Sequence, residues 1–156
     1  MTLTLRDATT DDAGLIAGFV RALAEFEKLA DHAVASDGDF VEAIAGGKVS
    51  ALIAEKNGTA VGFALWFQTF STFTGRSGLY LEDIYVEPEY RGHGIGRAIL
   101  RNLAGRALAA GCARMEWAVL DWNKPAVDFY RAIGARPMAE WTVQRMERGG
   151  LAALAE

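Results

Sequence analysis

The chain has 156 residues, of which 51% are hydrophobic and 23% are charged. This length and composition predict a single domain over residues 1–156 with a real hydrophobic core, and they exclude a disordered or fibrous chain. Sixteen basic and twenty acidic residues give a formal net charge of −4, which argues against a general nucleic-acid-binding protein and is compatible with a small cationic substrate.

The first half of the chain alternates short strands with helices. Thr9, Thr10 and Asp11 supply helix-start chemistry, and apolar side chains then recur at helical spacing. Asn57-Gly58 stands between two apolar runs, which is a strong signal for a two-residue hairpin turn. The expected elements are a strand at Leu3–Arg6, a helix carrying Leu15 to Phe26, a shorter helix from the Ser36-Asp37 cap to Gly46-Gly47, and strands at Val49–Glu55 and Ala60–Gln68.

The second half continues this alternation after a segment, Thr69–Gly78, whose Thr, Ser and Gly content predicts a loop. Strands followed by helices, with a hairpin between them, predict a mixed α/β sheet rather than a purely parallel one. The expected elements are a strand at Leu79–Val86, a helix ending near Ala110, a strand at Met115–Leu120, a helix at Pro125–Ile133, a strand at Trp141–Met146 that closes the sheet, and a weak helix at Gly150–Glu156.

The most informative segment, LYLEDIYVEPEYRGHGIGRAILRNL, runs from a strand through a proline-containing turn and a glycine-rich loop into a helix. Glycines at 92, 94 and 96 remove side chains where the backbone must curl and face a ligand closely. Free N–H groups at the helix start favour an anion, so a diphosphate is the obvious candidate, with Arg91 and Arg97 flanking the turn. Arg97 stands where the dinucleotide fingerprint requires its third glycine, and no Gly-Lys-Ser/Thr follows as in a P-loop. On glycine spacing alone, a flexible helix start that binds nothing is the alternative.

These residues resemble the acetyl-CoA motif of the GNAT N-acetyltransferase superfamily, Arg/Gln-x-x-Gly-x-Gly/Ala, which reads Arg91-Gly92-His93-Gly94-Ile95-Gly96 here. AVLDWNKPAVDFYRAIGA, at residues 118–135, is similar to a second hallmark of that superfamily. The combination of LEDIYV, RGHGIG and LDWN…FY resembles the diamine acetyltransferase group, most of all its thialysine-acetylating branch. The resemblance covers nearly the whole chain and implies a mixed, mostly antiparallel central sheet flanked by about four helices.

Acetyl transfer from a thioester to an amine requires a deprotonated amine, a donor for the oxyanion on the acetyl carbonyl, and a proton for the leaving thiolate. A lysine-type ammonium has a pKa of ~10.4, so a base or a proton relay is needed near neutral pH. Glu82 and Asp83 are adjacent acids in an apolar strand, where alternation places them on opposite faces and at least one is expected to be partly buried. This pattern favours a functional role for Glu82 over a salt bridge or a loop cap, and it leaves Asp83 open.

The resemblance implies roles for further residues. Glu82 is implied to be the base that removes the amine proton, directly or through water, or else to hold the amine. Tyr130 is implied to be the general acid, although its helical pattern alone favours a tyrosine of the core. Phe26 and Glu27 are implied to line the amine pocket together with Asp83. The residues implied for the coenzyme are Ile84, Tyr85 and Val86 through backbone groups, Arg91, Gly92, His93, Gly94, Ile95, Gly96 and Arg97 around the diphosphate, and Asn123, Pro125 and Ala126 along the coenzyme arm.

Several candidates also have a purely structural explanation. Asn123 is placed to cap the helix that follows it, and Phe26 and Glu27 fit an apolar stripe and its solvated shoulder. Cys112 has no histidine nearby in sequence and is expected to be a buried, inert thiol, which disfavours an acetyl-enzyme. His32 is expected to be a surface residue.

The sequence therefore predicts direct acetyl transfer from acetyl-CoA to a primary amine of a small cationic substrate, either a thialysine- or lysine-like amino acid, a diamine or a polyamine. The alternatives are an acetyltransferase for a protein lysine or N-terminus and a non-catalytic acyl-CoA-binding module. The acids at 27, 82 and 83 favour a small cation. We expect no metal, no nucleic acid and no membrane as partners, and the resemblance implies a homodimer. One cysteine and no visible targeting or membrane segment predict a cytoplasmic protein.

Overall fold

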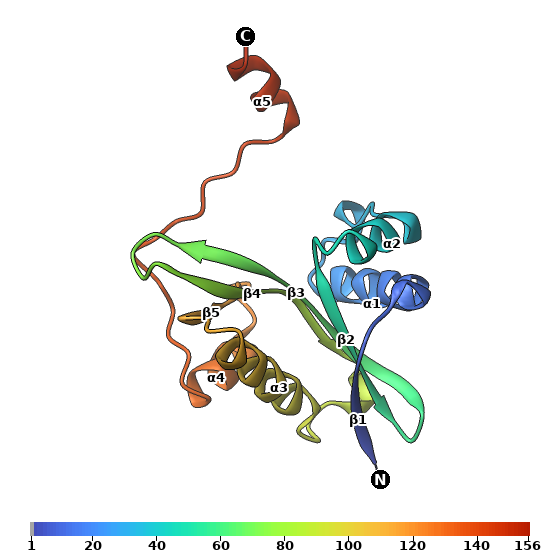
Figure 1. Ribbon diagram of the computed structural model, residues 1–156. Coiled ribbons are helices and arrows are strands. Elements are labelled where there is room, and N and C mark those ends of the chain that lie inside the picture. Colours follow the sequence, from blue (N-terminus) through green and yellow to red (C-terminus); the bar gives the residue numbers. More distant parts are fainter. Residues whose placement is uncertain (1) are drawn as a thin grey trace. The chain divides into compact units, whose positions relative to one another are not determined.

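The computed structural model describes residues 2–156 and contains a five-stranded sheet (Figure 1). The strands lie side by side in chain order, and every neighbouring pair is antiparallel except β4 and β5, which run parallel. This confirms the mixed, mostly antiparallel sheet that the sequence predicts. The strands are β1 (Leu3–Asp7), β2 (Ser50–Lys56), β3 (Thr59–Ser71), β4 (Arg76–Val86) and β5 (Arg114–Glu116).

Local sequence signals set where the elements begin and end. Ser36 and Asp39 each accept a hydrogen bond from the other's amide, which forms a capping box at the start of α2. Asn57 and Gly58 both have positive φ angles, 51° and 81°, as a two-residue hairpin turn requires. The α-helices of the described chain are α1 (Ala13–Phe26), α2 (Asp37–Ala45), α3 (Ile95–Ala109), α4 (Lys124–Ala132) and α5 (Arg148–Leu154).

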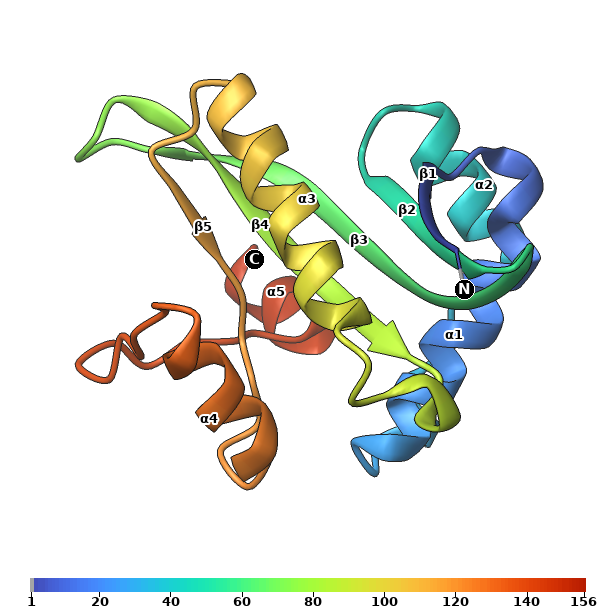
Figure 2. The same cartoon turned by 90° about the horizontal axis from the view of Figure 1, so that it is seen from below.

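The helices α1 and α2 cover one face of the sheet and α3 covers the other (Figure 2). On the α1 side, Phe19 stacks on Phe63 with ring centroids 5.4 Å apart, and it contacts the ring of Tyr85 at 6.0 Å. Ile16 and Phe63 are fully buried, and burial of such a side chain contributes about 1.5–3 kcal/mol to stability. This core holds the last residues of β4 against α1.

The two ends of β4 differ in their neighbours. β4 pairs with β5 over Gly78–Tyr80 only, so from residue 81 to residue 86 the described sheet has a strand on the β3 side alone. A β-bulge lies in the same region, because Leu65 pairs with Asp83 and Trp66 with Leu81, which leaves Glu82 as the extra residue. A bulge bends its strand and redirects side chains. The simple alternation expected for Glu82 and Asp83 is therefore interrupted at these residues.

The prediction of a loop over residues 69–78 is wrong. β3 continues to Ser71 and β4 begins at Arg76, so the connection is a short turn over residues 72–75 that contains Gly75 with a φ of 65°. Ladder partners extend through the segment, with Thr69 opposite Gly78 and Phe70 opposite Ser77. Cross-strand pairing therefore outweighs the turn-like composition of this segment.

Two expected strands also differ from the structure. The strand expected at 115–120 is the three-residue β5, Arg114–Glu116. The strand expected at Trp141–Met146 does not form, and Trp141 and Val143 are largely exposed. Alternation of apolar and polar residues marks a segment that is able to pair, but a strand also requires a neighbouring edge and a half-buried surface.

The described chain divides into two compact units, one ending at Ala118 and the other Val119–Glu156. The first contains the sheet and α1 to α3, and the second contains α4 and α5. The glycine-rich loop and the candidate acids belong to the first unit, whereas Asn123 and Tyr130 belong to the second. Within residues 2–156, every helix is too short or too polar to cross a lipid bilayer.

Candidate active site

The glycine-rich loop connects β4 to α3 through a single 3-10 turn, η3 (Pro88–Tyr90). Gly92 and Gly94 have φ angles of 79° and 82°, which lie in the left-handed region of the backbone that residues with a Cβ atom rarely adopt. Gly94 is the N-cap of α3, and its carbonyl accepts a hydrogen bond of 3.0 Å from the Ala98 amide. The backbone conformation of the loop therefore calls for glycine at 92 and 94.

The loop presents a row of free amide groups. Within the part of the chain that the structure describes, the N–H groups of residues 92–97 form no hydrogen bond. A Cβ atom placed on Gly92, Gly94 or Gly96 would meet nothing within 4 Å, so the space around them is open. Gly96 lies inside α3 without a positive φ, so the chain itself does not require glycine there. Free amides, open space and the positive end of a helix dipole fit a diphosphate group.

The two arginines that flank the loop differ in their surroundings. The side chain of Arg97 is exposed and makes no hydrogen bond or ion pair with the described chain. The side chain of Arg91 is engaged within the protein: its Nε donates to the Val86 carbonyl at 2.7 Å, and its guanidinium lies over the rings of Phe26 and Tyr85 at 5.0 and 5.2 Å. The sequence predicts diphosphate contacts for both arginines, and this structure leaves Arg97 as the free cation.

The candidate backbone groups at Ile84, Tyr85 and Val86 lie where β4 has a strand on one side only. An edge of this kind exposes N–H and C=O groups that a ligand with amide groups is able to pair with. The Val86 carbonyl is already bonded to Arg91. The open edge of β4 therefore fits the amide-bearing pantetheine arm of acetyl-CoA, as the resemblance implies.

An acidic cleft lies between the end of α1 and β4. It has a volume of about 150 Å³ and is lined by Val20, Leu23, Ala24, Glu27, Leu29, His32, Ala33 and Asp83. The chain reaches it through Lys28, a non-glycine residue with a φ of 61°, and η2 (Ala30–His32). Glu27 and Asp83, two of the predicted substrate residues, are thus brought together. His32 also lines the cleft and is exposed, which agrees with the surface position that the sequence indicates for it.

The electrostatics of the cleft single out Asp83. Burial, together with the nearby negative charges of Glu82 and Glu27, raises the pKa of Asp83 to about 6. Burial also raises the pKa of Glu27. Glu82 itself is exposed, so the partly buried acid of the pair is Asp83 and not the residue that sequence reasoning favoured. A cationic amine bound here would stabilise the charged form of both acids.

In the second unit, the predicted residues lie at the two ends of α4. The Asn123 side chain accepts a hydrogen bond of 3.4 Å from the Ala126 amide, so the capping role that the sequence left open is present. This cap uses Oδ1 and leaves the Nδ2 donors outside it. Tyr130 is half-buried in the last turn of α4, with its ring 5.6 Å from that of Phe129.

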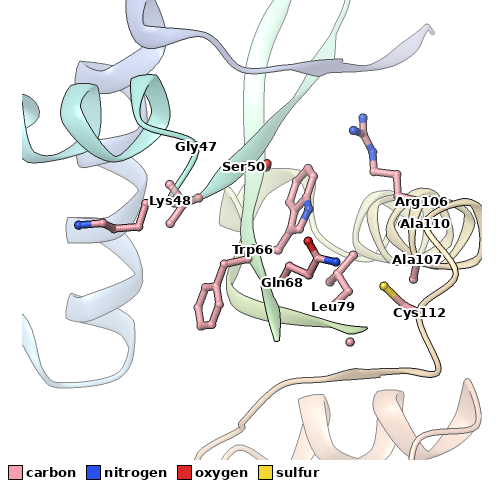
Figure 3. Close-up of a pocket in the computed structure, with 13 residues that line it drawn as sticks. Gly47, Lys48, Ser50, Trp66, Gln68, Leu79, Arg106, Ala107, Ala110 and Cys112 are labelled. Atoms are coloured by element: carbon pink, nitrogen blue, oxygen red, sulfur yellow. The ribbon is translucent and has the colours of Figure 1, made fainter. Parts of the chain in front are cut away.

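A larger cavity, of about 280 Å³, lies within the first unit, and none of the candidate site residues lines it (Figure 3). Its walls come from the turn before β2 and the start of β2, the middle of β3, the beginning of β4 and the end of α3, and none of residues 82–97 lines it. Trp66 and Cys112 face this cavity, and the Arg106 guanidinium lies over the Trp66 ring at 5.1 Å. Cys112 is a half-buried free thiol. Across the described residues, no group of three or more His, Cys, Asp or Glu side chains is placed to hold a metal ion.

Comparison with known proteins identifies the family. The model of the acetyltransferase (GNAT) family matches residues 19–135, which is well over half of the chain. The chain belongs to this family. It is 41% identical to the thialysine N-epsilon-acetyltransferase of Sus scrofa over 164 residues, covering 97% of this chain and 96% of that protein.

Two further proteins are informative. The L-ornithine N5-acetyltransferase of Arabidopsis thaliana is 38% identical over 93 residues, which cover 60% of this chain and 41% of that protein. A solved structure of an integron cassette protein of V. cholerae superimposes with a TM-score of 0.82 and 26% identity, covering 100% of this chain and 99% of that one. Family and relatives together establish the chain as an acetyl-CoA-dependent N-acetyltransferase of the GNAT fold.

Proposed function

We propose that this N-acetyltransferase transfers acetyl directly to a primary amine of a small cationic substrate, namely a thialysine- or lysine-like amino acid, a diamine or a polyamine. The observation that carries the proposal is the cleft in which Glu27 and Asp83 lie together, half-buried, beside the open edge of β4. Two carboxylates in one small cleft favour a small ligand with a second cationic centre beside the reacting amine, whereas a protein lysine or N-terminus brings one amine of its own. The names of the relatives from Sus scrofa and Arabidopsis thaliana support an amine on an amino-acid side chain.

The remaining roles follow from the needs of the reaction. When bound, acetyl-CoA supplies an acetyl group activated as a thioester. The amides of residues 92–97 and the Arg97 guanidinium hold its diphosphate, and free backbone groups along Ile84–Val86 hold its pantetheine arm. Glu82 accepts the amine proton directly or through water. The Tyr130 hydroxyl gives a proton to the leaving sulfur.

Asp83 and Glu27 hold the ammonium groups of the substrate. With its pKa raised to about 6, Asp83 is mostly a carboxylate at pH 7.5, and it is a stronger proton acceptor than an ordinary aspartate. Cys112 takes no part in this scheme, because it lines a cavity that contains none of residues 82–97. Transfer is therefore proposed to be direct, without an acetyl-enzyme.

The test is acetyl-CoA-dependent thiol release over a panel of lysine, thialysine, ornithine, diamines, polyamines and aminoglycosides, with a peptide carrying a free N-terminus and an internal lysine. We expect the highest kcat/KM for a small amine with a second cationic centre, and a KM for it that rises at least tenfold in Glu27→Gln. Turnover confined to the peptide would instead favour a protein acetyltransferase. Binding of acetyl-CoA without turnover of any amine would favour a non-catalytic module. The homodimer, the cytoplasmic location and the single-domain organisation over 1–156 stay predictions.

A further inference from the structure

We propose that Arg91 is a positioning residue that couples the coenzyme loop to the amine cleft, an inference that rests on the proposed function of both sites. Arg91 is the residue immediately before Gly92, so its backbone belongs to the loop. Its side chain bonds the end of β4 at Val86 and covers Phe26, the last residue of α1. One guanidinium thus joins the loop and the end of β4, which are neighbours in sequence, to the end of α1, which is far from both in sequence.

The contacts suit a guanidinium better than the side chain of lysine or glutamine. The Nε–H donates to the Val86 carbonyl at 2.7 Å, while the planar carbon centre lies 5.0 Å from the Phe26 ring and 5.2 Å from the Tyr85 ring. A lysine has a single ammonium on a flexible stem, so it cannot bond the carbonyl and cover two rings at once. A glutamine could keep the hydrogen bond, but it brings no charge to the rings.

Both walls of the amine cleft adjoin the residues that Arg91 contacts. Phe26 precedes Glu27, and Tyr85 is two residues from Asp83 along β4; Glu27 and Asp83 both line the cleft. The turn after α1 is held by hydrogen bonds from the amides of Glu27, Lys28 and Leu29 to carbonyls within the helix. If the Arg91 side chain is displaced, the turn after α1 loses the contact between the guanidinium and Phe26. The spacing between Glu27 and Asp83 is then no longer held by the glycine-rich loop.

Arg97 provides the matched control, because it is the other arginine of the loop and makes no contact of this kind. With acetyl-CoA saturating, we expect Arg91→Gln and Arg91→Lys to raise the KM for the preferred amine about two- to fivefold, which is the change in an equilibrium that an exposed cation–π contact produces. The Kd for acetyl-CoA, measured by calorimetry, should change less than threefold. Arg97→Gln should do the opposite, weakening acetyl-CoA and leaving the amine KM unchanged.

A double-mutant cycle identifies the coupling itself. In the Phe26→Leu background, Arg91→Gln should have a smaller effect on amine KM than in the wild-type background, because the ring that it covers is already lost. Phe26→Tyr keeps a ring and should preserve the full Arg91 effect. Additive effects of Arg91→Gln and Phe26→Leu would overturn the proposal.

Hydrogen exchange gives a readout that needs no substrate and no turnover. Arg91→Gln should speed exchange of the amides of residues 27–29, whereas Arg97→Gln should leave them as in the wild type. Unchanged exchange at 27–29 in Arg91→Gln would refute the coupling even in an active enzyme. If the wild type acetylates no amine but exchange still increases in Arg91→Gln, the proposed function fails and the structural coupling stands. A large loss of acetyl-CoA affinity with unchanged amine KM in Arg91→Gln would make Arg91 a diphosphate ligand instead.

Discussion

Gly96 offers a sharp test of the coenzyme loop, because the free protein does not require glycine at that position. Its backbone lies within α3 without a positive φ, and a Cβ atom there would meet nothing within 4 Å. Alanine is favoured over glycine in a helix interior by about 0.8–1.0 kcal/mol, which is the upper limit for Gly96 because it lies in the first turn of α3. Gly96→Ala should therefore leave the ligand-free protein as stable as the wild type or more stable, by up to about 1 kcal/mol. In a chain of this length, that corresponds to a rise in Tm of about 2–4 °C.

Binding should change in the opposite direction. A methyl group in front of the free amides of residues 92–97 would push a diphosphate away from them. A hydrogen bond to a charged group contributes about 1.5–3 kcal/mol, so displacing one such contact should weaken acetyl-CoA about 10- to 100-fold. If Gly96→Ala raises the stability of the free protein and lowers its affinity for acetyl-CoA, glycine is required at this position by the ligand and not by the fold.

Gly105 is the matched control, since it lies in the same helix and a Cβ atom there also meets nothing within 4 Å. Gly105→Ala should raise Tm in the same way and leave acetyl-CoA binding unchanged. The assays are scanning calorimetry without ligand and titration calorimetry with acetyl-CoA. Wild-type affinity in Gly96→Ala would refute the placement of the diphosphate at this loop, and weaker binding in Gly105→Ala would show that helix stability, not contact, is responsible.

Three further predictions concern the proposed catalytic and substrate residues. Tyr130→Phe should lower kcat at least tenfold with little change in the Kd for acetyl-CoA, as measured by steady-state kinetics and titration calorimetry; loss of coenzyme binding with unchanged chemistry would contradict the general-acid role. Glu82→Gln should slow turnover most at low pH, where less of the amine is neutral, so a pH-independent ratio of wild-type to variant kcat would argue against a base at this position. The pKa of Asp83 is about 6 in the folded protein against an ordinary 3.8, so the folded state binds the extra proton and wild-type stability falls as pH rises from about 4 to about 6. In denaturant titrations, Asp83→Asn should therefore have a free energy of unfolding up to about 3 kcal/mol above that of the wild type at pH 7.5, and the same free energy as the wild type below about pH 4. The same difference at both pH values would show that the raised pKa of Asp83 is not the cause.

Features that depend on a few neighbouring residues could be predicted from the sequence. The turn at Asn57-Gly58, the cap at Ser36 and the glycine-rich loop before α3 all appear where their local chemistry indicates. The conformation in each case is decided within a few residues, by positive φ angles and by side-chain caps.

Features that depend on distant partners could not be predicted in this way. Burial of Asp83 rather than Glu82 follows from a bulge in the β3–β4 register, and no pattern within β4 alone reveals a bulge. The contacts of Arg91 join residues 26, 85 and 86, and only the folded sheet brings α1 to that end of β4. A comparison of β3 and β4 for an unmatched residue would have been the one available signal for the bulge.

The separation of β5 from β4 after Tyr80 has a consequence for solubility as well as for binding. Unpaired strand edges act as templates on which other chains add, and proteins commonly defend them with bulges and charged residues. Here the stretch without a β5 partner begins at Leu81, and a bulged glutamate and an aspartate follow at once. The two carboxylates would thus keep molecules of the ligand-free enzyme from joining edge to edge, and neutralising both together should favour aggregation that acetyl-CoA, by filling the edge, suppresses.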